Sequence, residues 1–220
     1  MIDIVVIGSS GHARCVIDSV ELVGHYRIVG LVDDYRRIGE KTGNYRILGT
    51  VSDLPNLVSV HQLGGFIVAI GDNFARAAVT TMVQSLCPGL DLMCAIHPSA
   101  IVARGTVIGG GTVVLAGAII APECVIGVGC IINTGASIDH DSTMHDFSSI
   151  APRVVTGGNC QIGTITAIGI GAVLCHRICI GAHCVIGAGA VVLRSVKSFS
   201  VSYGSPAMHI RTRIAGEKYL

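Results

Sequence analysis

Two histidines and three aspartates gather in the segment "DHDSTMHD", residues 139–146. These aspartates are the only acidic residues between Cys124 and His176, in a tract rich in glycine and aliphatic side chains. A neighbouring carboxylate raises the basicity of an imidazole and fixes which ring nitrogen carries the proton. A general base that deprotonates an amine or a hydroxyl needs this arrangement. The pattern therefore predicts His140, which has an aspartate on each side, as a catalytic base.

Other interpretations of these histidines stay open. Polar repeats also mark corners that face solvent, and His145, His176 and His183 fit that structural interpretation. A zinc-dependent hydrolase would need three histidines converging on the metal, and His140, His145 and His176 are the only nearby set. A serine hydrolase fits poorly because the chain has no G-x-S-x-G motif. A non-catalytic structural protein is a further alternative.

The segment lies in a chain that repeats every six residues from Ile101 onward, beginning IVARGT, VIGGGT, VVLAGA. The second position of sixteen successive repeats runs from Val102 to Val192, and fifteen of these positions hold Val, Ile, Leu or Met. Thr156 is the exception. Six-residue repeats are typical of a parallel β-helix, in which three short strands form one triangular coil of 18 residues. The repeats predict about five coils.

The same repeat predicts which residues stack on one another. Residues 18 apart occupy equivalent places on successive coils, so Gly158 stacks on His140 and His176 lies two coils away from it. A glycine there leaves open space beside the imidazole. Four cysteines share the sixth position of the repeat, which predicts a small inward-facing slot where thiols act as small apolar groups. These are Cys124, Cys130, Cys160 and Cys184.

Residues 1–95 have a different pattern, in which strands and helices alternate. Apolar runs predict strands at 2–8, 27–34 and 65–73, and helical spacing or propensity predicts helices within 8–24 and at 74–87. Alternating strands and helices form a small parallel sheet of the β-α-β kind. We therefore expect a Rossmann-like α/β domain over residues 1–95, followed by a β-helix with its C-terminal tail over residues 96–220.

A second candidate site follows the strands of the first domain. Ser10, Gly11 and His12 lie between the first strand and helix, Asp33 and Asp34 end the second strand, and Gly71 follows the third. Open α/β sheets bind ligands at the carboxyl ends of their strands, and helix N-termini favour phosphate. The chain lacks the G-x-G-x-x-G of dinucleotide enzymes at this turn, which disfavours NAD.

Composition excludes several classes of partner. The net charge is +1 and 13% of the residues are charged, which implies no strong attraction to nucleic acid or to an anionic membrane surface. The uncharged stretch Val154–His176 has the length of a membrane span, but its glycines and six-residue period disfavour a helix. Nine cysteines without an export signal predict reduced thiols in the cytoplasm.

The whole chain resembles a family of bacterial acetyltransferases. The resemblance runs through "IVVIGSSGHA", "GLVDD", "VAIGDN", "IHPSAIV", "NTGASIDHD", the hexapeptides and "YGSPA", in that order. The family includes N-acetyltransferases of nucleotide-linked 4-amino sugars and sialic acid O-acetyltransferases. The resemblance implies a left-handed β-helix and a homotrimer, with acetyl-CoA bound between the β-helices of neighbouring subunits. It implies no required metal. It implies an N-acetyltransferase for a nucleotide-linked 4-amino-4,6-dideoxy sugar, with a sugar O-acetyltransferase as the alternative.

The resemblance also implies roles for individual residues. His140 would be the base and Asp141 its assistant. Nucleotide-sugar contacts would come from Ser10, Gly11, His12, Asp33, Asp34 and Gly71. Gly158, Ile170 and Ala188 would line the CoA channel. Apart from the resemblance, we expect the backbone N–H of a glycine such as Gly158 to hold the oxyanion. Ser149 stands where many relatives carry a second histidine near the thioester, and Met208 replaces a basic residue after "GSPA".

Overall fold

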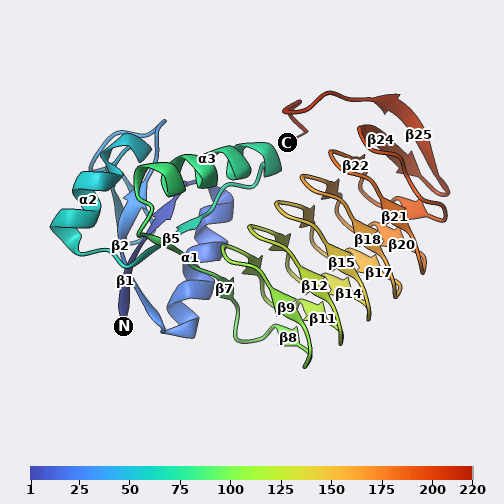
Figure 1. The fold of residues 1–220 in the computed structure, drawn as a ribbon, viewed down its shortest axis with the longest axis horizontal. Coiled ribbons are helices and arrows are strands. Elements are labelled where there is room, and N and C mark those ends of the chain that lie inside the picture. The colour runs from blue at the N-terminus through green and yellow to red at the C-terminus, as the bar shows by residue number, and fades with distance from the viewer. Residues whose placement is uncertain (220) are drawn as a thin grey trace.

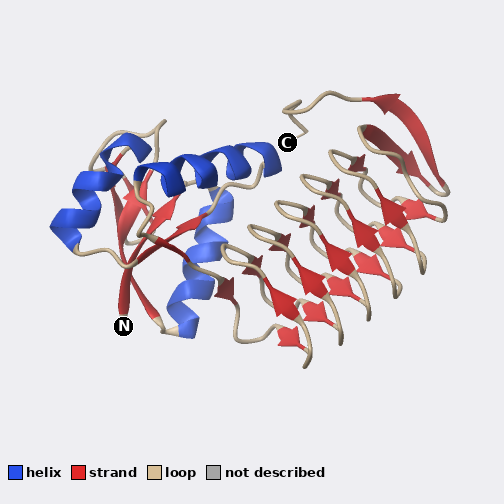
Figure 2. Cartoon of the chain, viewed as in Figure 1, coloured by secondary structure: helices blue, strands red, loops and turns tan. Residues whose placement is uncertain are grey.

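The computed structural model describes residues 1–219 and has two parts (Figure 1). An α/β domain stands at one end of a prism built from short stacked strands (Figure 2). The elements of the α/β domain are β1 (Ile2–Ile7), α1 (Gly11–Val23), β2 (Tyr26–Val32), β3 (Lys41–Thr42), β4 (Tyr45–Gly49), α2 (Leu54–His61), β5 (Gly65–Val68), α3 (Asn73–Leu86) and β6 (Asp91–Leu92). The predicted strands and helices of this domain correspond to β1, β2, β5, α1 and α3, with shifts at their ends.

The sheet of this domain has the order β3-β4-β2-β1-β5-β6. All of its neighbouring strands are parallel except β3 and β4, which form an antiparallel pair. The predicted parallel sheet is therefore found in β4, β2, β1, β5 and β6, and β3 adds an antiparallel strand at one edge. The sequence patterns also missed α2, β3, β4 and β6, because two to eight residues are too few to display a period.

The prism has three faces, each a ladder of parallel two-residue strands. The first face contains β7 (Ala95–Ile96), β10 (Val113–Val114), β13 (Ile131–Ile132), β16 (Ser149–Ile150), β19 (Ala167–Ile168) and β22 (Val185–Ile186). The second face contains β8 (Ile101–Val102), β11 (Ile119–Ile120), β14 (Ser137–Ile138), β17 (Val155–Thr156), β20 (Val173–Leu174) and β23 (Val191–Val192). The third face contains β9 (Val107–Ile108), β12 (Val125–Ile126), β15 (Thr143–Met144), β18 (Gln161–Ile162) and β21 (Cys179–Ile180).

This is the architecture of a left-handed parallel β-helix, as expected from the hexapeptides. Strand partners lie 18 residues apart, as in Ile131 opposite Ser149. Second-position side chains such as Ile120 and Ile138 fill the prism with at most 1% of their surface exposed. The four sixth-position cysteines are equally buried, which confirms the small inward slot. The strand β24 (Ser200–Gly204) extends the first face and pairs antiparallel with β25 (Ala207–Thr212).

The α/β domain packs against the first face of the prism. A shared apolar cluster joins Ile4, Val6 and Ala13 to Val113 and Leu115 of the β-helix. Residues 154–176 form short strands and turns of the prism. The membrane-spanning helix considered for this stretch is therefore not present. Within residues 1–219, the helices are all too short or too polar to cross a bilayer.

Arg76 fastens the two parts together. Its side chain is 1% exposed, and its guanidinium donates to carbonyl oxygens on both sides of the junction. The acceptors in the β-helix are Gly129 at 2.7 Å and Phe147 at 3.1 Å, and Gly71 accepts at 3.1 Å in the α/β domain. Burial lowers the pKa of Arg76 to about 10, which leaves it charged at neutral pH. This residue therefore fixes the end of β5 relative to the prism.

Candidate active site

His140 lies in the turn between β14 and β15, at the corner where the second and third faces meet. Its side chain is 51% exposed and so faces outward rather than into the prism. Nδ1 of the ring is 2.7 Å from Oδ2 of Asp141, while Oδ1 of Asp139 accepts the His140 backbone N–H at 2.8 Å. With Nδ1 held by a carboxylate, Nε2 is the ring nitrogen available to a substrate.

The ring packs against Gly158 of the next coil. A Cβ atom on this glycine would stand 2.7 Å from both Cε1 and Nε2 of His140. Any other residue type would therefore push the ring out of its place. The stacking predicted from the 18-residue period is confirmed, and the glycine provides the space that the imidazole occupies.

The carboxylates around His140 strengthen it as a base. The hydrogen bond that Asp141 accepts from the ring raises the pKa of His140 above its ordinary value, and the charge of Asp139 adds to the effect. Asp146, the third aspartate of the cluster, has a different task, because its Oδ1 accepts the Val128 N–H at 2.8 Å. Only two of the three clustered aspartates therefore act on the imidazole.

The Gly158 N–H is not available for an oxyanion. It donates to Nδ1 of His176 at 2.9 Å, so the expectation that it would hold the oxyanion was wrong. His176 lies two coils from His140 and uses its ring to satisfy this backbone group. The histidines considered for zinc do not form a ligand group, since residues 1–219 contain no set of three metal-ligating side chains that converge.

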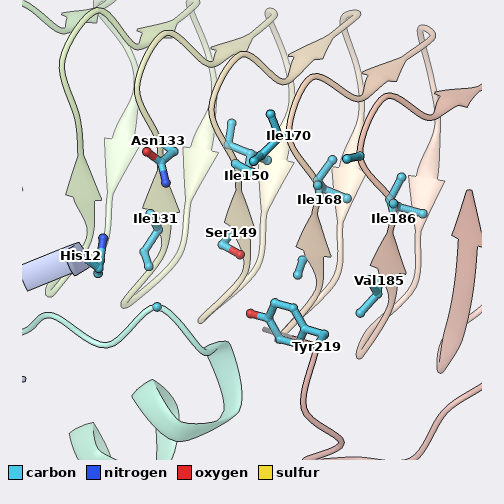
Figure 3. Close-up of a pocket in the computed structure, with 16 residues that line it drawn as sticks. His12, Ile131, Asn133, Ser149, Ile150, Ile168, Ile170, Val185, Ile186 and Tyr219 are labelled. Carbon is cyan, nitrogen blue, oxygen red and sulfur yellow. The ribbon is translucent and has the colours of Figure 1, made fainter. Parts of the chain in front are cut away.

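A cavity of about 440 Å³ opens between the α/β domain and the first face (Figure 3). We call it the interdomain cavity. Its walls are mostly aliphatic, and they include Ser149, Ile170 and Ala188, three of the four residues expected at acetyl-CoA. The fourth, Gly158, lies at the His140 corner instead. An apolar groove with few polar groups suits a pantetheine chain better than a charged ligand.

Polar groups gather at the end of this cavity nearest the α/β domain (Figure 3). Nε2 of His12 is buried there without a hydrogen-bond partner. Burial, aided by the charge of Arg76, lowers the pKa of His12 to about 4, so the ring is neutral at physiological pH. Asn133 and Tyr219 line the same cavity. An unpaired neutral imidazole facing a cavity is ready to bond a ligand hydroxyl or amine.

A second cavity, of about 260 Å³, lies at the carboxyl ends of β1, β2 and β5. We call it the sheet-edge cavity. It is lined by Ser10, Asp33, Asp34 and Gly71, which were expected at the nucleotide-sugar. Gly11 begins α1 beside it, and His12 turns to the interdomain cavity. The Ser10 side chain makes no capping bond to α1, which leaves the N–H groups of its first turn for a phosphate.

Asp33 and Asp34, the two acids of the sheet-edge cavity, differ in how many hydrogen bonds they already accept. Asp33 accepts the Ser9 hydroxyl and the Tyr35 N–H with its two oxygens. Asp34 accepts the Val51 N–H with one oxygen at 2.8 Å. Asp34 therefore keeps more hydrogen-bonding capacity for a nucleoside than Asp33 does.

Known proteins resemble this chain in both parts. The family model described as the PglD N-terminal domain matches residues 3–83. The structure of a mutant of perosamine N-acetyltransferase from Caulobacter crescentus, in complex with CoA and GDP-perosamine, has a TM-score of 0.90 and 32% identity. That match covers 95% of this chain and 97% of the other. The chain belongs to the sugar N-acetyltransferase family.

Two further structures place this sugar N-acetyltransferase among its relatives. The acetyltransferase domain of PglB from Neisseria gonorrhoeae FA1090, in complex with acetyl coenzyme A, is 32% identical with a TM-score of 0.86, covering 94% of this chain and 98% of that one. WeeI from Acinetobacter baumannii AYE has 21% identity and a TM-score of 0.83, and the match covers 96% of this chain and 100% of that one. At this identity the match supports the fold alone. No curated protein sequence matches the chain.

Sequence patterns did not single out several residues of this acyltransferase. Asn133 opens the "NTGASIDHD" motif, seven residues before His140, so its place near the histidine motif was the available signal. Tyr219 comes from the C-terminal tail, and its hydroxyl accepts the Asn73 N–H at 3.0 Å. Nothing in the spacing of the tail indicates that it returns to this cavity and to Asn73, 146 residues away in the chain.

Proposed function

We propose that this sugar N-acetyltransferase transfers the acetyl group of acetyl-CoA to the amine of a nucleotide-linked 4-amino-4,6-dideoxy sugar. The observation that carries the proposal is the outward-facing His140 imidazole, bonded to Asp141 and packed on Gly158. The sheet-edge cavity would hold the nucleotide and the interdomain cavity the pantetheine. The complexes of relatives with CoA and GDP-perosamine, and with acetyl coenzyme A, support these two classes of ligand.

The active site would be completed by a second copy of the chain. His140 lines neither cavity, because it stands at the corner of the second and third faces. The interdomain cavity lies on the first face, and the sheet-edge cavity is lined by the α/β domain alone. The second face also exposes aliphatic side chains, with 42% of Ile119, 44% of Val155 and 42% of Val173 accessible. A homotrimer would cover such side chains and bring His140 of one subunit to the cavities of the next.

Subunit complementation would test this arrangement. Ala188→Phe fills the interdomain cavity and His140→Ala removes the base, so each variant alone should be nearly inactive. Co-expressed, they should regain activity, because a mixed trimer contains sites that pair an intact cavity with an intact histidine. Light scattering should give the mass of three chains of 22.7 kDa. A single-chain mass, or no regained activity in a proven mixed oligomer, would contradict the proposal.

The chemistry would be direct acyl transfer. The neutral amine nitrogen attacks the thioester carbon, and Nε2 of His140 takes the proton that the nitrogen loses. The C–S bond then breaks, and the proton passes from the imidazolium to the departing CoA thiolate. No acyl-enzyme is needed, which agrees with the burial of Cys124, Cys130, Cys160 and Cys184 in the prism. Burial also raises the pKa of these thiols and keeps them protonated.

The substrate assay separates the proposal from its alternative. Acetyl-CoA would be offered with matched nucleotide sugars that carry an amine or a hydroxyl at the same carbon, and with sialic acid. Acetylation of the amine alone supports N-acetyl transfer, whereas turnover of the hydroxyl compounds would make the enzyme an O-acetyltransferase. A panel of UDP-, GDP-, dTDP- and CMP-sugars in a thermal-shift screen would identify the nucleotide.

Replacing Asp141 by asparagine should shift the pH profile. The carboxylate is the largest cause of the raised His140 pKa, so its loss lowers that pKa. Because the reactive form of the base is unprotonated, the acid limb of kcat/KM should move to lower pH. The plateau should fall as well, since a weaker base transfers the proton less readily. Asp146→Asn is the control, because Asp146 accepts the Val128 N–H and does not bond the imidazole. This variant should leave the acid limb in place. An unmoved limb in the Asp141 variant would contradict this role.

A further inference from the structure

The backbone hydrogen bonds between successive coils of the prism follow a regular pattern, and this pattern is interrupted directly before His140. In a regular coil, the N–H of the third residue of a repeat donates to the carbonyl of the second residue one coil further on. Ala121 donates to Ile138 at 2.9 Å in this way, and His145 donates to Ile162 at 2.8 Å. The rule holds for each other third-position residue from Ala103 to Cys175.

Asp139, directly before His140, departs from the rule. Its N–H donates to the side-chain Oγ1 of Thr156 at 3.1 Å instead of to the Thr156 carbonyl. The strand pairing shortens accordingly, because β14 and β17 match only at Ser137 and Val155. Neighbouring pairs such as β11 and β14 match at both of their residues.

Thr156 is also the one polar residue in the column of sixteen second positions. Its side chain is 3% exposed and lies inside the prism, where the other members are aliphatic. A buried hydroxyl without a partner is costly, and the Asp139 N–H provides that partner. The Thr156 hydroxyl thus accounts for both the polar exception in the second-position column and the missing backbone hydrogen bond of Asp139.

We infer that Thr156 is a positioning residue, which detaches the turn of His140 from the regular ladder and sets the imidazole over Gly158. The inference rests on the proposed role of His140 as the base. Local departures from strand pairing beside active sites commonly re-aim a side chain. The Thr156 hydroxyl holds Asp139, and Oδ1 of Asp139 in turn accepts the His140 N–H. An aliphatic side chain at 156 would leave the Asp139 N–H to pair with the carbonyl, as in every regular coil.

The rest of the turn has its own attachments. The Asp141 N–H donates to the Pro122 carbonyl at 3.1 Å, and the Asn159 N–H donates to the His140 carbonyl at 2.9 Å. These bonds join the turn to the coils on both sides without using Thr156. Removing the hydroxyl should therefore change the path of the turn while the prism remains folded.

Thr156→Val tests the inference, because valine matches the aliphatic column and has nearly the same size. We expect kcat to fall about 10- to 100-fold, as a misplacement near 1 Å can produce. The KM values should stay within about threefold, and the melting temperature should equal or exceed that of the unchanged enzyme. Thr156→Ser keeps the hydroxyl and should restore most of kcat. Thr156→Ala is a second variant without the hydroxyl.

Thr112→Val is the matched control. Thr112 is also buried, and its hydroxyl accepts the Cys130 N–H at 3.1 Å, but it lies at the corner of the third and first faces. This variant should lose thermal stability and keep kcat, the reverse of Thr156→Val. A normal kcat in Thr156→Val, or an equal loss in Thr156→Ser, would overturn the inference. Full activity of His140→Ala would instead overturn the proposed base, so the two failures are distinguishable.

Discussion

Replacement of His140 by alanine should lower kcat by about 100- to 10,000-fold, the range that a positioned general base contributes. The physical reason is that alanine provides no group to take the proton from the attacking amine. Steady-state kinetics with acetyl-CoA and the amino sugar would measure the loss. The oligomer should persist, because the side chain is half exposed and leaves no gap in the core.

Binding measurements make this result specific to the chemistry. Calorimetry should show CoA bound to His140→Ala with nearly unchanged affinity, because the substitution leaves every lining residue of the interdomain cavity intact. His145→Ala is the matched control, an exposed histidine of the same segment that touches neither His140 nor a cavity. Activity of His140→Ala near that of His145→Ala would remove His140 from the mechanism.

The second large effect is expected from a single added methyl group. Gly158→Ala should lower kcat by about 100-fold, because its Cβ would lie 2.7 Å from Cε1 and Nε2 of His140 and must displace the ring. The backbone at Gly158 lies outside the left-handed region, so alanine adds no backbone strain there. Kinetics and thermal denaturation of the variant would separate ring displacement from unfolding.

A double-mutant cycle shows whether this loss acts through the imidazole. In the His140→Ala background, Gly158→Ala should have almost no further effect on kcat, because no ring remains to be displaced. Gly89→Ala is the control, since a Cβ at that glycine meets nothing within 4 Å. Additive losses in the double variant would contradict the proposed contact between Gly158 and the base.

The sequence by itself determined the β-helix and the immediate surroundings of the base. A six-residue period needs no long-range information, because each coil repeats the same inward and outward positions. It therefore predicted the column of second-position side chains, which is buried from Val114 to Val192, the small slot of the four cysteines, and the stacking of Gly158 on His140. It also marked Thr156 as an exception, without indicating that the hydroxyl holds the Asp139 N–H.

Only the tertiary structure decided how the parts of the site are distributed. It placed Ser149, Ile170 and Ala188 on the wall of one cavity and left His140 at a different corner of the prism. It also showed that the Gly158 N–H is taken by His176. These facts depend on how the α/β domain docks on the first face and on which backbone groups find partners. Contacts between residues far apart in the chain, such as Arg76 with Gly129, fix the docking, and no local period encodes them. The period stacks His176 on Gly158 but does not encode which backbone group the imidazole binds.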